Sequence, residues 1–169
     1  MKRKAVAVTA VVLVALLSLI AFGGARYMRR QSDGEVKVVS KVKSLVVVES
    51  RVEHDAEGKP AYVVITLRNK SPRTLLAVAL DSQVQPGFST HQVKSPIDNS
   101  TGADIPLAPP GGTFEIHYPS SNYGDEVVVS AAAFDDGSEE AASPDARANL
   151  RDARAKLRAE SERKRGRAK

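Results

Sequence analysis

The sequence contains no cysteine and no tryptophan among its 169 residues. Without cysteine the chain has no disulfide framework, no thiolate metal site and no thiol nucleophile. This absence leaves the compartment open, because periplasmic or cell-surface domains that fold without oxidation and cytosolic domains can all lack cysteine. Imidazole ligands are few as well. His54, His91 and His117 fall on separate predicted strands or strand ends, and we interpret each as a surface residue.

Catalytic motifs are missing too. The sequence has no Gly-x-Ser-x-Gly elbow, no P-loop, no glycine-rich dinucleotide motif and no His-Glu-x-x-His helix. Residues 135–140 (DDGSEE) lack the ligand spacing of an EF-hand, so we interpret them as a hairpin turn followed by a solvated acidic link, with weak calcium binding as the alternative. We predict no enzyme activity and no catalytic, cofactor-binding or metal-ligating residues. A metal site that joins two of the histidines with carboxylates is the alternative.

Positive charge is scarce in the middle of the chain. Residues 31–143 carry nine basic and sixteen acidic side chains, whereas residues 1–30 carry six basic and no acidic ones. Residues 144–169 carry ten basic and four acidic side chains, and the formal net charge of the chain is +5. The basic character therefore belongs to the two ends, and a nucleic-acid-binding face on an acidic central domain is disfavoured. We expect no nucleic-acid partner.

One long apolar run is present, from Ala5 to Ala25, with no charged residue. As a helix its 21 residues would span about 31 Å, close to the ~30 Å hydrocarbon core of a bilayer. We predict a signal-anchor within residues 1–30 that makes the chain a single-pass membrane protein, with a cleaved signal peptide ending at Gly23-Gly24-Ala25 as the alternative. The basic flanks are nearly balanced, but the short basic start is typical of export, so we predict an extracytoplasmic β domain, in the periplasm or at the cell surface.

Apolar and polar residues alternate through much of the remaining chain. Residues 61–71 (AYVVITLRNKS) have the period of a half-buried strand, and the turn residues Asn69 to Pro72 precede another apolar run at 75–80. We predict that these two strands form a hairpin at the centre of the domain. Further strands are predicted within residues 36–52 (one strand, or two broken near 40–44), 87–93, 113–118 and 126–134, the last with Val127, Val129, Ala131 and Ala133 on one face.

The C-terminal segment, residues 143–169, changes to helical signals. Ser143-Pro144-Asp145 combines an N-cap, a proline at the first helical position and an acid in the first turn. A narrow apolar stripe of Ala146, Leu150, Ala153 and Leu157 predicts a largely exposed helix that frays beyond about Glu160. The basic end after it is either a solvated tail or a polybasic segment that contacts anionic lipid or an acidic surface.

Three short motifs carry a resemblance. They are Leu67 to Ser71 (LRNKS), Leu107 to Gly111 (LAPPG) and Phe134 to Ser138 (FDDGS). As a set they resemble the turns of small immunoglobulin-like or fibronectin-like sandwich modules found behind signal peptides in bacterial envelope proteins. The resemblance covers roughly residues 45–140 and lacks the Cys and Trp core of antibody domains, so it implies a fold and carries no functional residue.

These observations predict a mainly β protein. We expect an immunoglobulin-like β-sandwich at residues 44–140, joined by a tether and possible first strand at 31–43 to an N-terminal transmembrane helix, and followed by a charged α-helix. Its expected role is a protein-binding or envelope-assembly module. The alternatives are a structural spacer or stalk without a ligand, and a metal-dependent enzyme. A binding module should expose an apolar patch or an unpaired strand edge, and residues 87–93 are the predicted weakly paired edge. The sequence leaves the oligomeric state open.

Overall fold

The computed structural model describes residues 36–85, 88–120, 124 and 126–167. The internal contacts divide the chain into two units, Met1–Glu35 and Val36–Lys169. The predicted membrane anchor, Ala5 to Ala25, lies outside the described residues. Within the described ranges, no helix combines the length and apolar character needed to span a bilayer.

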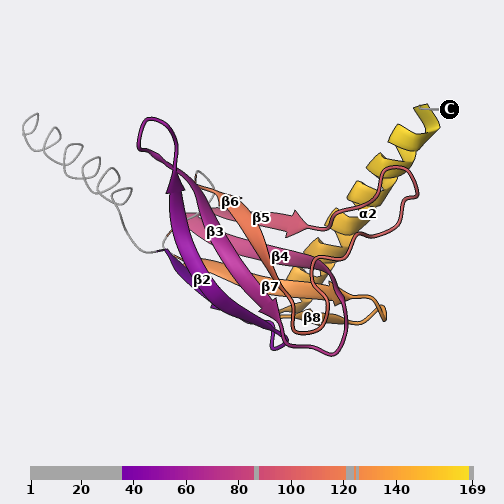
Figure 1. Ribbon diagram of the computed structural model, residues 1–169, viewed down its shortest axis with the longest axis horizontal. Coiled ribbons are helices and arrows are strands. Elements are labelled where there is room, and N and C mark those ends of the chain that lie inside the picture. Colours follow the sequence, from indigo (N-terminus) through magenta and orange to yellow (C-terminus); the bar gives the residue numbers. More distant parts are fainter. Residues whose placement is uncertain (1–35, 86–87, 121–123, 125, 168–169) are drawn as a thin grey trace, which may run out of the picture. The chain divides into compact units, whose positions relative to one another are not determined.

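The second unit is mainly β, with two packed sheets and one C-terminal helix (Figure 1). One sheet has three antiparallel strands in the order β2-β3-β6: β2 (Leu45–His54), β3 (Pro60–Asn69) and β6 (Thr113–Pro119). The other has five strands, with the order β1-β7-β4-β5 and β8 also paired to β7: β1 (Lys37–Ser40), β7 (Glu126–Phe134), β4 (Leu75–Gln85), β5 (Phe88–Lys94) and β8 (Glu139–Ala141). β1 runs parallel to β7, and the other pairs are antiparallel.

The core lies between the two sheets. The alternation predicted for residues 113–118 is confirmed, because Ile116 and Tyr118 of β6 are fully buried while Glu115 and His117 are exposed. Residues 36–52 form two strands, as one alternative predicted, and β1 and β2 belong to different sheets. The largest fully buried side chains in this core are Tyr118, Phe134, Leu45, Ile65, Leu67, Leu75, Leu80 and Ile116.

The predicted central hairpin is wrong, because β3 and β4 lie in different sheets. The buried side chain of Asn69 shapes the crossing between them. Its Oδ1 accepts a hydrogen bond from the Ser71 backbone N–H (3.0 Å), and its Nδ2 donates to the Arg73 carbonyl (2.7 Å) and more weakly to the Ala108 carbonyl (3.3 Å). An asparagine that satisfies carbonyls on two segments turns the chain out of one sheet and into the other.

A β-bulge in β7 contradicts the strict alternation predicted for residues 126–134. Ala79 of β4 faces Ala131 and Leu80 faces Val129, so Ser130 is the extra residue that shifts the register. Before the bulge Val127 and Val129 face the core between the sheets, whereas after it Ala132 and Phe134 do. The bulge therefore turns Ala131 and Ala133 to the outer face of the five-stranded sheet.

Helix α2 (Pro144–Arg167) packs on that outer face. Its predicted start is confirmed, because the Ser143 hydroxyl accepts a hydrogen bond from the Ala146 N–H at 3.1 Å. The predicted fraying beyond about Glu160 is wrong, since the helix continues to Arg167. Contacts of its second half with a loop, described below, explain the extra length.

Candidate functional site

Strand β5 forms one edge of the five-stranded sheet. Among the described strands it pairs only with β4, over Phe88 to Lys94 with one register shift. The predicted edge position of residues 87–93 is confirmed for the described part of that range, but the predicted weak pairing is wrong, because pairing with β4 extends along the whole strand. Phe88 is 52% exposed, and Lys94 is the only charged residue of β5 if His91 is neutral.

Side chains tie β5 to β6 across the open side of the sandwich. The hydroxyls of Thr90 and Tyr118 lie 2.7 Å apart, and Gln92 Nε2 donates to the His117 carbonyl at 3.4 Å. Burial raises the pKa of Tyr118, and this outweighs the opposite effect of its hydrogen bond with Thr90. The phenol therefore stays protonated at neutral pH and holds the two edges together as an uncharged group.

The first two turns of α2 pack on a surface of alanines. Ala146 and Leu150 are buried against the outward-facing alanines of β4 and β7, which are Ala77, Ala79, Ala131 and Ala133. Small side chains on the sheet let the helix approach closely, so Leu150 is fully buried. Because this contact uses only the start of a 24-residue helix, the rest of α2 needs other partners.

The second half of α2 and the loop at residues 96–105 form what we call the arm, which extends beyond the sheets (Figure 1). Here the inward stripe of the helix changes from apolar to polar, with members spaced by four, three and four residues: Arg154, Arg158, Ser161 and Arg165. Asp104 Oδ2 accepts from Arg154 Nη2 (2.9 Å) and from Arg158 Nη2 (2.6 Å). Arg165 Nη1 donates to the Thr101 carbonyl at 2.8 Å.

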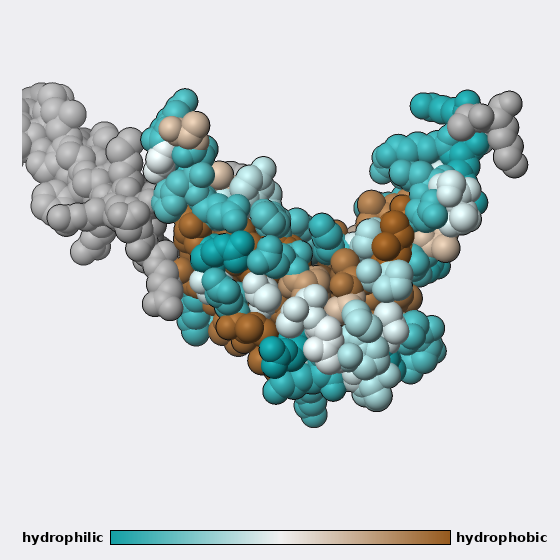
Figure 2. Space-filling view, in the orientation of Figure 1, coloured by the Kyte–Doolittle hydropathy of each residue, from teal (hydrophilic) through white to brown (hydrophobic). Residues whose placement is uncertain are grey.

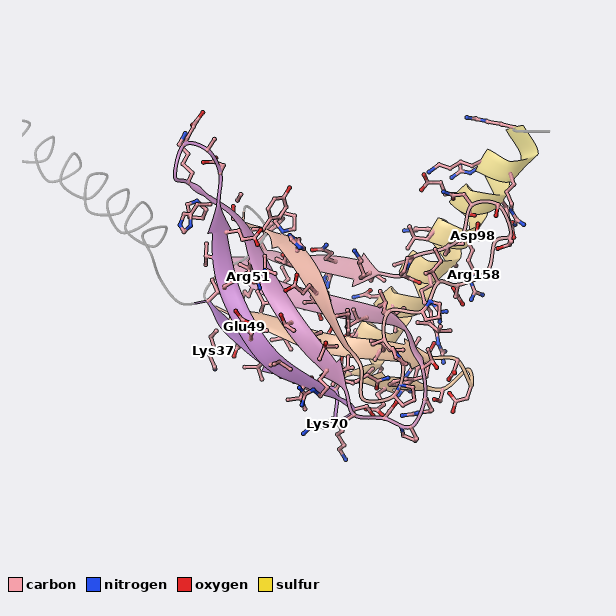
Figure 3. All side chains as sticks on the ribbon, viewed as in Figure 1. Lys37, Glu49, Arg51, Lys70, Asp98 and Arg158 are labelled. Atoms are coloured by element: carbon pink, nitrogen blue, oxygen red, sulfur yellow. The ribbon has the colours of Figure 1, made fainter. Side chains whose placement is uncertain are left out.

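The loop also has hydrogen bonds of its own, centred on Asp98. Asp98 Oδ1 accepts from the Ser100 hydroxyl (2.6 Å) and backbone N–H (2.7 Å) and from the Thr101 N–H (3.3 Å). These bonds to the ionised carboxyl lower the pKa of Asp98 to about 2. Figure 3 shows Asp98 and Arg158 at the arm, far from Lys70 at the other end of the sandwich.

Buried polar atoms without partners concentrate in the arm. Of six such side-chain atoms in the described ranges, four belong to this contact: Asp104 Oδ1, Arg154 Nε, Ser161 Oγ and Arg165 Nε. Each buried polar group without a hydrogen bond costs about 1–3 kcal/mol. The arm is thus held by ion pairs and hydrogen bonds, and the unpartnered polar atoms reduce the net stabilisation that these contacts give.

The opposite side of α2 carries what we call the basic row: Lys156, Arg163 and Arg167. All three are exposed, and none lies within 4.0 Å of a carboxylate in the described part of the chain. Other basic residues of the helix do have partners, such as Arg151 with Glu139 at 2.8 Å. Hydrophilic residues cover the distal half of the helix in the space-filling view (Figure 2). Within the described residues the basic row therefore makes no close ion pair, although Glu160 attracts Arg163 at longer range.

The outer face of the three-stranded sheet is a network of paired charges. Arg51 lies 3.1 Å from Glu115, 3.3 Å from Glu53 and 3.9 Å from Glu49. Figure 3 shows Glu49 and Arg51 together on β2, and Figure 2 shows hydrophilic and hydrophobic residues side by side over the sandwich. The paired charges are typical of a solvated surface, although Val48 of β2 and Tyr62 of β3 are also exposed on this sheet.

The acidic segment after the Asp135–Ser138 turn is not the solvated link that we predicted, because its residues form β8. The turn itself is confirmed, with Gly137 at a positive φ of 80°. Glu140 of β8 accepts from the backbone N–H and hydroxyl of Ser44 and from Arg73 Nη2 at 2.8 Å. Burial raises the pKa of Glu140, but these hydrogen bonds outweigh it and the net pKa is lowered. This cluster joins the two sheets and is structural.

The histidines do not come together. His91 Nδ1 lies 2.8 Å from Asp81 Oδ1, and His117 Nδ1 lies 3.7 Å from Glu53 Oε2. Throughout the described ranges, no three His, Asp or Glu side chains are grouped in a way that could hold a metal ion. The two candidate surfaces are therefore the β5 edge and the arm. Comparisons of this chain with protein-family models, curated proteins and solved structures find no match.

Proposed function

We propose that this chain is a membrane-anchored, extracytoplasmic protein whose immunoglobulin-like domain binds a protein partner in the cell envelope. The observation that carries the proposal is the β5 edge, which pairs on one side only among the described strands. An unpaired strand edge offers a row of backbone N–H and C=O groups to an incoming strand. At about 3.3 Å per residue, the seven residues of β5 offer an edge of roughly 23 Å.

The strand order supports the immunoglobulin-like part of the proposal. β2, β3 and β6 take the places of strands A, B and E, while β8, β7, β4 and β5 take those of G, F, C and C′. The chain departs from antibody domains in two ways: it has no cysteine or tryptophan in the core, and β1 runs parallel to β7. The assignment concerns architecture, and the binding role rests on the edge.

The membrane part of the proposal rests on the sequence. The apolar run from Ala5 to Ala25 matches a bilayer in length, and the basic start of the chain is typical of export. We propose that the run stays attached as an anchor and that residues 36–169 lie outside the cytoplasm. We propose no catalytic role and no cofactor for the domain.

The edge is weakly protected against strand addition. Natural edge strands are commonly guarded by inward charges, prolines or bulges. β5 contains no proline, its single lysine is the last residue, and its first residue, Phe88, exposes an apolar ring. A spacer without a ligand, which is the alternative function, would have no use for such an edge and would be expected to guard it.

Photo-crosslinking in cells tests the binding role. A photoreactive amino acid at His91, in the middle of β5, should give a defined crosslinked protein product. The same amino acid at Thr66, on the charge-paired outer face, is the matched control and should give none. Crosslinks from both positions, or from neither, would contradict partner binding at the edge and favour the spacer.

Reporter fusions test the anchor and the topology separately. Reporters that are active only in the periplasm or only in the cytoplasm are fused after Lys169, and membrane retention is measured for each. We expect an exported and membrane-retained product. A cytoplasmic C-terminus would contradict the extracytoplasmic placement, whereas an exported but freely soluble product would indicate a cleaved signal peptide.

A further inference from the structure

We propose that the basic row of α2, Lys156, Arg163 and Arg167, contacts the anionic phospholipid headgroups of the membrane that anchors the chain. This inference rests on the proposed anchor but not on partner binding at β5. It concerns a surface on the opposite side of α2 from the contacts that hold the helix to the domain. The proposed occupant of this surface is the anionic lipid itself.

The geometry of α2 suits a flat surface. At about 100° per residue the three basic positions fall within roughly 40° of one another around the helix. From Lys156 to Arg167 they extend over about 16 Å along its axis. Two exposed alanines, Ala155 and Ala159, lie along one side of the row, while the carboxylates of Asp152 and Glu160 lie about 40° from Lys156 on either side. Long basic side chains can then reach a plane of phosphates together.

The row keeps a net positive charge for an outside partner. Glu139 pairs with Arg151, Asp104 pairs with Arg154 and Arg158, and Glu160 pairs with Lys164 at 2.9 Å. These carboxylates pair with four of the other basic residues of α2, whereas the basic row makes no ion pair within 4.0 Å in the described part of the chain. Asp152 and Glu160 lie beside the row on the same side of the helix, and Glu160 attracts Arg163, but three basic residues against two carboxylates leave this side net positive. Anionic lipid surfaces attract each basic residue near them by about fivefold in binding, so three act together by roughly 100-fold.

The surroundings of the row favour lipid over a protein or nucleic acid. Protein interfaces centre on buried aromatic or large apolar anchors, and the row has none. A nucleic acid would meet the acidic middle of the chain, where acidic residues outnumber basic ones sixteen to nine. A chain anchored up to Ala25 would keep its domain within reach of the bilayer, because ten linking residues extend at most ~36 Å.

A single fluorescent label reads the contact directly. The chain has no cysteine, so Ala159→Cys provides one unique labelling position beside the basic row. The labelled full-length protein is reconstituted into nanodiscs of phosphatidylcholine alone, or of phosphatidylcholine with phosphatidylglycerol, each with an acceptor dye on a headgroup. We expect strong energy transfer in the anionic discs and weak transfer in the neutral ones. The transfer should fall as salt rises to 1 M, where the Debye length is about 3 Å.

Matched variants separate the row from net charge. The test variant is Lys156→Gln/Arg163→Gln/Arg167→Gln, and the control is Lys43→Gln/Arg68→Gln/Lys70→Gln, which removes three exposed charges from the sandwich. We expect the test variant to lower the ratio of membrane-bound to free helix by roughly 100-fold in anionic discs. The control variant should change this ratio by less than about threefold, since its charges lie on other elements.

Three outcomes would overturn the proposal. The first is equal energy transfer in neutral and anionic discs. The second is an equal loss of energy transfer in the test and control variants. The third is energy transfer that is lost on addition of an acidic protein or a nucleic acid and under no other condition. Retention of the protein in the discs is recorded separately, so a failed anchor is distinguished from a helix that ignores lipid. Crosslinking from His91 should be the same in the test variant and the unaltered chain, because the two surfaces are independent.

Discussion

At the scale of single residues, Gly102 adopts a left-handed backbone conformation and also leaves room for the Arg165 guanidinium. Its φ is +77°, and a Cβ added there would lie 2.6 Å from Arg165 Nη2. Gly102→Ala should therefore strain the backbone by about 1–2 kcal/mol and also displace the Arg165 guanidinium. We expect faster amide hydrogen exchange in residues 96–105 and in the last turns of α2.

Gly58 provides a matched control for this substitution. Its φ is +76°, but a Cβ added there would have nothing within 4 Å. Gly58→Ala should produce a similar backbone strain without any change in exchange at the arm. If both variants change the exchange of α2 equally, Arg165 does not hold the loop.

Asn69 is the residue on which the crossing between sheets depends. Asn69→Ala removes the hydrogen bonds to the Arg73 and Ala108 carbonyls and to the Ser71 N–H in a buried place. We expect the free energy of unfolding to fall by about 3 kcal/mol, because buried groups lose their partners. Urea denaturation measures this loss, and a change below about 0.5 kcal/mol would show that the crossing does not need the amide.

The order of the loop at residues 96–105 should depend on acid through Asp98. The pKa of Asp98 in the folded chain, about 2, lies below the ordinary value of 3.8 for an aspartate. Its contribution to stability is therefore present above pH ~4 and is lost as the pH falls toward 2. Carboxyl NMR should report the low midpoint, and Asp98→Asn should remove the acid dependence of exchange in this loop. A midpoint near 4 would contradict the hydrogen-bonded carboxylate.

At the scale of elements, α2 is held by one large apolar side chain. Leu150 is fully buried on the alanine face of the five-stranded sheet. Leu150→Ala should cost about 2–5 kcal/mol in the attachment of the helix, and Leu157→Ala, at a half-buried position, should cost less. Hydrogen exchange of α2 measures both. Equal effects would indicate that the second half of the helix carries as much of the attachment as the first.

The sequence predicted elements where the periodicity is local. The alternation at 113–118 marked β6, and Ser143-Pro144-Asp145 marked the start of α2, because strand period and helix capping depend on neighbouring residues. The bulge at Ser130 escaped prediction because the pairing with β4 decides it. The turn sequence from Asn69 to Pro72 is compatible both with a hairpin within one sheet and with a connection between two sheets. Only the pairing of the next strand in the second sheet decides between these two possibilities.

The two candidate surfaces were harder to predict from the sequence. The prediction of an edge at residues 87–93 rested on no specific sequence signal, because strand signals are weak between residues 81 and 110. The arm was not predicted, because it depends on Asp104 meeting Arg154 and Arg158 from 50 and 54 residues away. One sequence signal could have predicted the arm. Arginines at helical spacing occupy a side of the helix where the apolar stripe would be expected to continue. Strand β8 was not predicted, because its acidic residues indicate a solvent-exposed link and not a strand.

At the scale of the whole molecule, charge is divided between an acidic middle and a basic end. The ion pairs of Asp104 and Glu139 hold the basic helix to the acidic domain. Raising salt from 0.1 M to 1 M shortens the Debye length from about 10 Å to about 3 Å. We expect faster hydrogen exchange in the arm at high salt and unchanged exchange in β3 and β6. Uniform protection at both salt concentrations would show that the arm is held by packing instead.

The parallel pairing of β1 with β7 has a mechanical consequence. Lys37 lies opposite Glu126 and Ser40 opposite Val129, so the two strands run side by side in one direction. A pull directed along β1 from its first residue loads the evenly spaced hydrogen bonds of this ladder in shear, all at once. A hairpin pulled apart at its open end would instead lose its bonds one after another. Tension that enters through the N-terminal segment therefore meets a shear clamp before it reaches β2 and the core.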